Sequence, residues 1–154
     1  MPVIDITSLK SALQPGQCLL GLDLGSKTIG LAVSDPGFIV ASPIDTIRRT
    51  KFTKDLGVLK EIITTRNVGG LVLGLPVSMD GSEGPRCQST RQFATNVLGD
   101  MDISIALWDE RLSTSAIQRI LIDEADMTRR RRAEVVDKMA AAYILQGALD
   151  VMTQ

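Results

Sequence analysis

Acidic residues stand in this sequence where apolar runs that predict buried strands come to an end. Asp23 closes an apolar run that begins at Leu19 and precedes a Gly-Ser-Lys-Thr turn, while Asp109 and Glu110 follow the run Ile103–Trp108. Carboxylates beside buried strand positions need a compensating partner, because an unpaired charge is almost never buried. A bound cation is the natural candidate for that partner.

A further acid, Asp137, lies near the start of a predicted helix. Ala140, Ala141 and Ile144 follow it at positions i+3, i+4 and i+7, which places Asp137 on the small, apolar face of that helix. Each acid alone has an ordinary structural explanation: a turn, an ion pair with Arg111, or the helix dipole. Their joint placement predicts a metal site, where two cations about 4 Å apart can activate a water and stabilise the leaving oxygen of a phosphodiester.

The sequence contains no histidine, which restricts the possible chemistry. Ser-His-Asp and Cys-His nucleophilic catalysis, histidine general bases and histidine metal sites are excluded. The two cysteines, Cys18 and Cys87, form neither a disulfide framework nor a zinc site. Any metal must therefore be held by oxygen ligands, which select Mg²⁺ or Mn²⁺.

Length and composition predict one compact soluble domain, with 154 residues of which 44% are hydrophobic and 23% charged. A net charge of −1 and only 3% aromatic residues argue against binding nucleic acid by bulk electrostatics or base stacking. No segment approaches the roughly 18 apolar residues of a membrane span, and no signal-peptide pattern is present, so we expect a cytoplasmic protein without membrane contact. Two basic patches are expected to be solvated unless they flank an acidic site: Arg48, Arg49, Lys51 and Lys54, and the run Arg129–Arg132.

The hydrophobic pattern predicts an α/β fold with a mixed five-stranded sheet, in which three antiparallel strands precede parallel βαβ units and helices flank the sheet. Residues 1–16 are expected to form an N-terminal arm or short helix outside the core, and residues 17–154 the domain. Strands are predicted at 18–24, 28–34, 38–47, 68–75 and 103–108, helices at 52–67, 86–98, 113–122 and 133–151, and a mobile charged segment at 124–132. Asp23 and the acids at 109 and 110 then emerge at the carboxyl edge of the sheet, where open α/β sheets bind ligands.

Four segments together resemble the YqgF/RuvX family of the RNase H-like superfamily, and the match extends from about Leu19 to Leu149. The segments are Gly21–Asp35, Gly74–Pro76 with Met79–Arg86, Asp109–Thr114, and Val136–Ala141. The resemblance implies an RNase H-like fold and a cytoplasmic bacterial nuclease that processes the 5′ end of the small-subunit ribosomal RNA precursor, with Mg²⁺ or Mn²⁺ at its acids. An older proposal for the family, based on similarity to RuvC, is resolution of Holliday junctions.

The resemblance implies that Asp23, Glu110 and Asp137 are the catalytic residues that bind the metal. Asp109 is the alternative to Glu110, because strand alternation in the sequence does not decide which of the two faces the site. The residues expected to bind substrate are Ser26, Lys27, Thr28, Arg86 and Arg111. The expected partner is a nucleic acid, either structured RNA such as pre-16S rRNA or, as the alternative, a DNA junction. The protein is expected to act as a monomer or a homodimer.

Three other classes of protein share part of this sequence pattern. A P-loop nucleotide hydrolase is disfavoured because the residues after Thr28 alternate as a strand, whereas a phosphate-binding loop leads into a helix. The sugar-kinase/actin type of ATPase needs two such domains, and 154 residues supply one. A non-catalytic RNA-binding or transcription-associated factor with the nuclease fold would have no need for the three acids, so direct metal binding would separate it from a nuclease.

Overall fold

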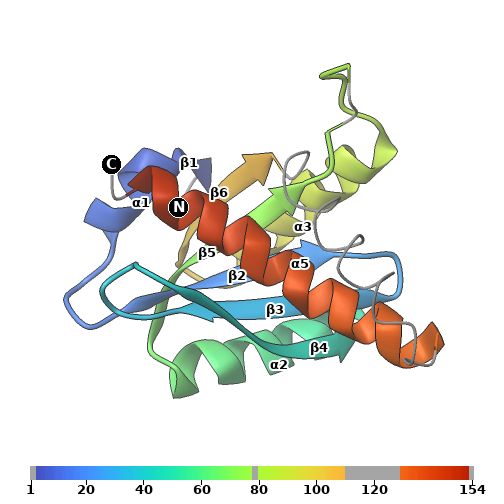
Figure 1. Cartoon of the computed structure of the whole chain (residues 1–154), viewed down its shortest axis with the longest axis horizontal. Coiled ribbons are helices and arrows are strands. Elements are labelled where there is room, and N and C mark those ends of the chain that lie inside the picture. The colour runs from blue at the N-terminus through green and yellow to red at the C-terminus, as the bar shows by residue number, and fades with distance from the viewer. Residues whose placement is uncertain (1–2, 78–79, 110–128, 153–154) are drawn as a thin grey trace.

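The computed structural model describes residues 3–77, 80–109 and 129–152, and for residues 129–137 it describes the backbone alone. At its centre is a six-stranded sheet in the order β1-β6-β5-β2-β3-β4 (Figure 1). Its strands are β1 (Val3–Ile4), β2 (Cys18–Leu24), β3 (Thr28–Ser34), β4 (Ala41–Arg48), β5 (Val68–Leu75) and β6 (Ser104–Asp109). β3 is antiparallel to β2 and β4, whereas β2, β5, β6 and β1 run parallel. The predicted mixed sheet is confirmed, but the count of five strands was wrong because β1 adds an edge strand.

The two central strands, β2 and β5, are buried on both faces of the sheet. In β2, Leu19 packs into the core on one face and Leu20 and Leu22 pack into the core on the other. Burial on both faces is the reason that these strands are continuous apolar runs rather than alternating ones. The bounds predicted for β2, β3 and β5 match the structure.

The third predicted strand began too early. Strand β4 starts at Ala41 rather than at Phe38, because Phe38 adopts a φ of 59°, in the left-handed region that strand residues do not use. The carboxylate of Asp35 holds this turn by accepting backbone N–H groups at 3.2, 2.7 and 2.9 Å, from Gly37, Ile39 and Val40.

The Asp35 turn makes a pH-dependent contribution to stability. Hydrogen bonds from the N–H groups of Val40 and Ile39 lower the pKa of Asp35 below its ordinary value of 3.8. The contribution is therefore complete above that ordinary value and is lost as the pH falls through the lowered pKa of the folded state. We expect Asp35→Asn to unfold at lower denaturant concentration than the wild type at pH near 7, and this difference to shrink as the pH is lowered below the ordinary pKa of the carboxyl. A difference that stays the same over the whole acid range in which the protein folds would contradict this account.

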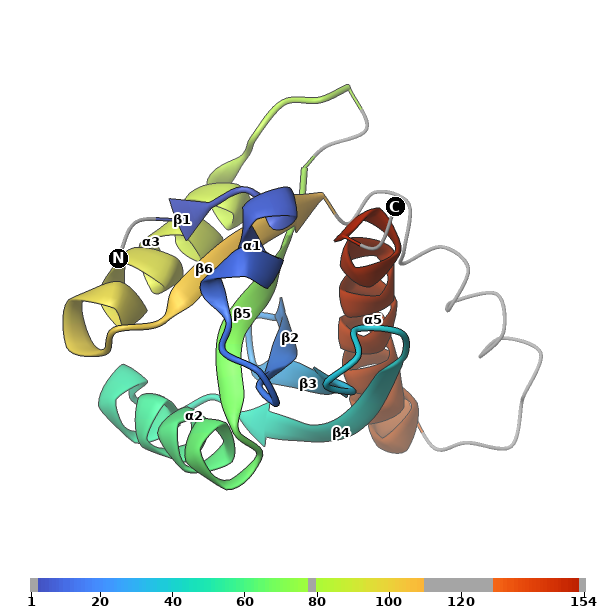
Figure 2. The same ribbon diagram turned by 90° about the vertical axis from the view of Figure 1, so that its left-hand side faces the viewer.

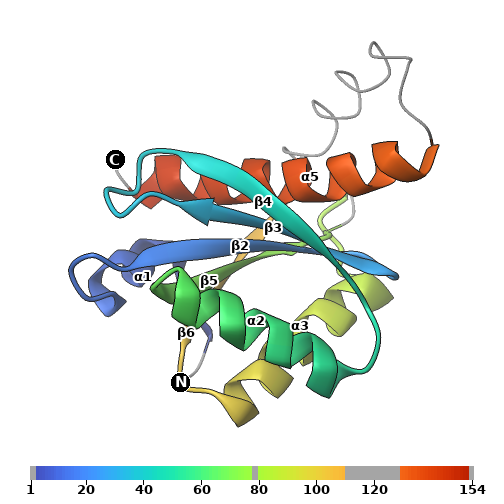
Figure 3. The same cartoon turned by 90° about the horizontal axis from the view of Figure 1, so that it is seen from below.

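Helices cover both faces of the sheet (Figure 3). α2 (Phe52–Thr65) and α3 (Pro85–Asp100) lie on one face, and α5 (Arg129–Met152) lies on the other. The core under α2 and α3 includes Phe93 and Val97, whereas the core under α5 includes Leu145 and Ala148. Within the described part of the chain, no helix is both long and apolar enough to cross a membrane.

The N-terminal segment belongs to the core, contrary to prediction. It contains the short helix α1 (Ile6–Ala12), which packs with α5 and lies beside β6 and β1 (Figure 2). Leu9 is fully buried and Ile6 is 8% exposed, and both join the apolar cluster on the α5 face. These two residues are three positions apart, so they share one face of a helix and can bury it together.

The last helix, α5, begins at Arg129, earlier than the predicted start at 133. The charged segment 124–132, expected to be mobile, therefore contributes its four arginines to the helix, consistent with the good helix propensity of arginine. Ala140, Ala141 and Ile144 are buried as predicted. The helix predicted at 113–122 lies outside the described residues.

Candidate active site

The carboxyl ends of β2, β5 and β6 meet at one edge of the sheet, as the prediction required. Parallel pairing aligns Leu22 with Leu73, and Leu75 with Asp109. Asp23 lies at this edge and is half-buried rather than fully buried. Since side chains alternate along a strand, Asp23 shares the α5 face with Gly21 and Leu19. The first predicted acid is therefore at the edge where open α/β sheets hold their ligands.

Asp109 lies on the opposite face of the sheet from Asp23. In β6, Ala106 and Trp108 pack into the core on the α5 face, whereas Ile105 and Leu107 pack into the core under α2 and α3. Asp109 continues the second set, because alternate residues of a strand share a face. The structure thus places Asp109 and Asp23 on opposite faces of the sheet. Strand alternation in the sequence alone did not decide the face of Asp109. Glu110 and Arg111 lie outside the described residues.

Helix α5 approaches β2 very closely at Gly21. A Cβ atom placed on Gly21 would lie 2.8 Å from the Cβ of Leu145 and 3.0 Å from the carbonyl oxygen of Ala141. Contacts this short are possible only because residue 21 is glycine. Ala141, from the predicted small, apolar face of the helix, lies at this crossing point, whereas the role of Gly21 in the close approach was not predicted.

The direction of α5 carries position 137 towards Asp23. Later in the helix, the side chain of Gln146 accepts a hydrogen bond from the N–H of Ala41 at 2.9 Å. Ala41 is paired with Ser34 in the sheet, and the hydroxyl of Ser34 accepts the N–H of Leu19 at 2.9 Å. Gln146 is thus near the Leu19 end of β2, while Ala141 is over Gly21. One turn before Ala141, the backbone of α5 reaches position 137 on the Asp23 side. The side chain of Asp137 lies outside the description.

Among the side chains that the structure describes, no group of three acids or thiols is placed to hold a metal ion. Two of the predicted ligands, Glu110 and the side chain of Asp137, lie outside the part of the chain that the structure describes. Both cysteines are free and buried, and burial raises the pKa of the Cys18 thiol, which donates a hydrogen bond to the carbonyl of Arg66. Carboxylates from Asp23, Glu110 and Asp137 would form an all-oxygen set, which fits a hard cation such as Mg²⁺ or Mn²⁺.

The turn after β2 is a compact backbone structure. The N–H of Gly25 donates to the carbonyl of Thr28 at 2.8 Å, and the N–H of Arg49 donates to the carbonyl of Lys27 at 2.8 Å. Ser26 and Lys27 are exposed, and Thr28 is half-buried. Because Thr28 begins the strand β3 and no helix follows the turn, the P-loop alternative is wrong.

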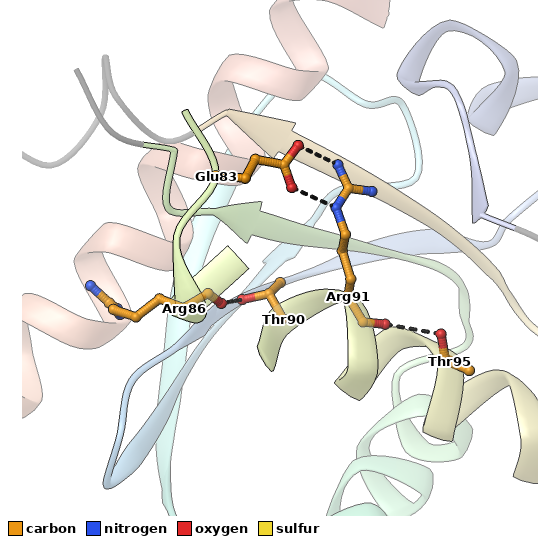
Figure 4. A network of polar contacts seen from close by, with 5 residues as sticks. All are labelled: Glu83, Arg86, Thr90, Arg91 and Thr95. Carbon is orange, nitrogen blue, oxygen red and sulfur yellow. Dashed lines mark hydrogen bonds and ion pairs between the residues drawn. The ribbon is translucent and has the colours of Figure 1, made fainter. Parts of the chain in front are cut away.

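Arg86 lies in the first turn of α3, and its side chain extends away from a neighbouring ion pair (Figure 4). Its guanidinium is 3.5 Å from the carbonyl oxygen of Leu24, at the end of β2. The neighbouring pair joins Glu83 and Arg91 through two contacts of 2.8 Å, and Arg91 lowers the pKa of Glu83. Arg86 is therefore directed towards the end of β2, while Arg91 ties the preceding loop to the helix.

Arg49 also reaches the end of β2, although the sequence analysis gave it no specific role. Its guanidinium donates to the carbonyl of Gly25 at 2.7 Å and lies 5.9 Å from the ring centroid of Phe93. The available signal was the basic patch that contains Arg49, which was expected to gain a function if it flanked an acidic site. The structure places this member of the patch beside the strand end that carries Asp23.

Comparisons with known proteins find close relatives of this chain. The RuvX family model, described as Holliday junction resolvase, matches residues 17–151. A protein of Paramagnetospirillum magneticum is 63% identical over 97% of this chain and 96% of its own length. A protein of Rhodospirillum rubrum is 59% identical over 99% of this chain and 94% of its own length. Both relatives are named "Putative pre-16S rRNA nuclease".

Solved structures of resolvases share the fold. The yeast mitochondrial Holliday junction resolvase Ydc2 matches with a TM-score of 0.57 and 9% identity, over 96% of this chain and 84% of that one. RuvC of T. thermophilus, solved with a Holliday junction substrate, matches with a TM-score of 0.55 and 11% identity, over 89% of this chain and 96% of that one. The predicted RNase H-like fold is confirmed, and with the sequence matches above, this chain belongs to the RuvX family.

Proposed function

We propose that this protein is a metal-dependent nuclease that hydrolyses phosphodiester bonds in the cytoplasm, in the processing of the 5′ end of pre-16S rRNA. The observation that carries the proposal is the close crossing of α5 over Gly21, which brings position 137 towards Asp23 at the carboxyl edge of the sheet. Family membership and the names of the two relatives support the substrate.

The residues proposed to hold the metal are Asp23, Glu110 and Asp137. Asp109 is disfavoured because it lies on the other face of β6. Bound between these acids, divalent cations would supply an activated water and charge stabilisation for the leaving oxygen. The acids themselves would hold the cations at the strand ends, since carboxylates repel a phosphate unless a cation lies between them. They also depend on the cation, because three adjacent carboxylates without it would raise one another's pKa.

The residues proposed to bind substrate are those around the end of β2 together with Arg111. The exposed turn offers a hydroxyl from Ser26, an ammonium from Lys27 and the hydroxyl of Thr28, and Arg86 offers a guanidinium beside the same strand end. Hydroxyls and cations of this kind supply much of the contact that proteins make with the phosphates of a nucleic acid. The contacts therefore fit recognition of backbone and shape, which is how structured RNA is bound.

Resolution of DNA junctions is the second candidate function. It is favoured by the family model's description and by the likeness of this fold to RuvC of T. thermophilus, which was solved with a Holliday junction substrate. A junction resolvase cuts two strands and so needs two active sites related by a twofold axis. That function therefore requires a homodimer, whereas RNA processing is compatible with a monomer or a homodimer.

One experiment separates these functions. A labelled fragment of ribosomal RNA precursor and a four-way DNA junction are incubated in parallel with wild type and with Asp23→Asn, in Mg²⁺ or Mn²⁺. We expect metal-dependent cleavage of the RNA by the wild type alone. Cleavage confined to the junction would replace RNA processing with resolution. If neither substrate is cut and the protein binds no Mn²⁺, the nuclease proposal fails in favour of a non-catalytic RNA-binding factor.

A further inference from the structure

A pocket of about 150 Å³ lies beside the turn that follows β2. Three segments distant in the sequence build it: the turn after β2, Arg49 after β4, and the first two turns of α3. Its lining consists of Leu24, Gly25, Ser26, Arg49, Arg86, Ser89 and Thr90. The pocket was not predicted, because only the fold brings these segments together.

The charged side chains at this pocket favour an anion. Two guanidinium groups, from Arg49 and Arg86, contribute to it, and none of its seven lining residues is acidic. Each guanidinium carries five N–H donors in a planar fork that matches phosphate oxygens. Ser26 and Ser89 add hydroxyl groups at the exposed rim. Arginine forks together with hydroxyl groups form a typical phosphate-binding environment.

Contacts within the fold hold Arg49 in place and direct Arg86 towards the same strand end. Arg49 donates to the carbonyl of Gly25 at 2.7 Å and stands over the ring of Phe93, which forms a T-shaped pair with Phe52. The exposed Arg86 is in the first turn of a 16-residue helix, with its guanidinium 3.5 Å from the carbonyl oxygen of Leu24. Because Arg49 is already ordered beside the strand end, an anion there would find this partner in place.

The pocket and the acid lie on opposite sides of the same strand end. Leu24, which lines the pocket, packs into the core under α2 and α3, while Asp23 faces α5. Their Cα atoms are about 3.8 Å apart, as for any consecutive residues. A nucleic acid strand that crosses the end of β2 would therefore meet the acid with one phosphate and the pocket with a neighbouring one.

We propose that this pocket, built on Arg49, Arg86 and Ser89, binds an internal phosphodiester of the substrate strand next to the one that is cut. The proposal rests on the proposed nuclease function and adds Arg49 and Ser89 to the residues that contact substrate. The pocket positions the substrate strand, so loss of the pocket weakens substrate binding and leaves the acidic site intact.

The test uses an isosteric pair of variants at Ser89. Ser89→Glu introduces a negative charge into the pocket, whereas Ser89→Gln introduces the same bulk without charge. Ser89 is exposed on α3, and both Glu and Gln are good helix formers, so both variants are expected to fold. Both are made in full-length Asp23→Asn protein, which allows binding to be measured without cleavage.

Binding is measured with two RNA oligonucleotides of one sequence, one with a 5′-hydroxyl and one with a 5′-phosphate. We expect Ser89→Glu to raise Kd about tenfold on both, and Ser89→Gln to change it by less than about threefold, because like charges repel across an interface. The slope of log K against log salt is negative, and its magnitude should fall by about 0.7 in Ser89→Glu and in Arg49→Gln, the value for one lost phosphate contact on a single strand. Lys10→Gln, which removes an exposed charge on α1, should leave the slope unchanged.

Each other outcome overturns a specific part of the proposal. Equal Kd values for Ser89→Glu and Ser89→Gln would overturn the pocket as a phosphate site, even where the wild type cuts RNA. A loss confined to the 5′-phosphorylated oligonucleotide would overturn the internal phosphodiester in favour of a terminal phosphate. Loss of affinity in Ser89→Glu together with a wild type that cuts nothing would support the pocket and reject the nuclease function.

Discussion

Glu110→Gln is expected to lower metal-dependent cleavage by about 10³-fold, whereas Asp109→Asn lowers it by less than about tenfold. A metal-bound carboxylate contributes several kcal/mol to stabilising the transition state, and about 1.4 kcal/mol corresponds to tenfold in rate. Asp109 lies on the α3 side of β6, opposite to Asp23, so its replacement carries only the effect of an ordinary substitution near a site, about 1 kcal/mol.

The measurement combines single-turnover cleavage with direct binding of Mn²⁺. Both substitutions replace an acid by its amide, so each serves as the other's control for the loss of one negative charge. We expect Mn²⁺ affinity to fall in Glu110→Gln and to be retained in Asp109→Asn, with circular dichroism unchanged in both. The opposite ranking of the two variants, in cleavage and in metal binding, would assign the metal to Asp109 and reject our assignment of faces.

The contrast between 109 and 110 indicates what the sequence could establish about the site. The apolar run and its end were predictable, because a buried strand needs continuous apolar residues and an acid marks its limit. The face of the sheet on which Asp109 lies was not predictable. The residues of β6 are apolar on both faces, and alternation does not indicate which helix covers which face. Only the packing of Trp108 with the α5 core and of Leu107 with the other core assigns the faces.

Elements that local turns delimit were predicted correctly, whereas contacts between distant parts of the chain were not. β2, β3 and β5 were predicted to the residue because turns of glycine, proline or polar residues delimit them. The segment 1–16 was misplaced because Ile6 and Leu9 are too few apolar residues to signal burial, and their burial depends on α5, far away in the chain. The pocket that contains Arg49 was missed for a related reason: the residue after β4 and the start of α3 come together only in the folded protein.

Gly21→Ala is expected to destabilise the fold by about 1–3 kcal/mol and to reduce cleavage as well. The added Cβ would meet the Cβ of Leu145 at 2.8 Å and the carbonyl oxygen of Ala141 at 3.0 Å. These atoms cannot turn aside as the tip of a flexible side chain could, so α5 must shift away from β2. The proposed ligand Asp137 is one turn from Ala141 on that helix, so the shift would move it relative to Asp23.

Gly57→Ala is the matched control. Gly57 is exposed within α2, and a Cβ there would meet nothing within 4 Å, so the same substitution should stabilise the protein by up to about 1 kcal/mol. The single tryptophan of the chain, Trp108, packs close to Gly147 of α5, so its fluorescence reports on how this helix sits on the sheet. We expect Gly21→Ala to change this fluorescence in the folded state and Gly57→Ala to leave it unchanged. Unaltered fluorescence and full cleavage in Gly21→Ala would mean that the close crossing is not what positions Asp137, and the central support for the proposed metal site would be lost.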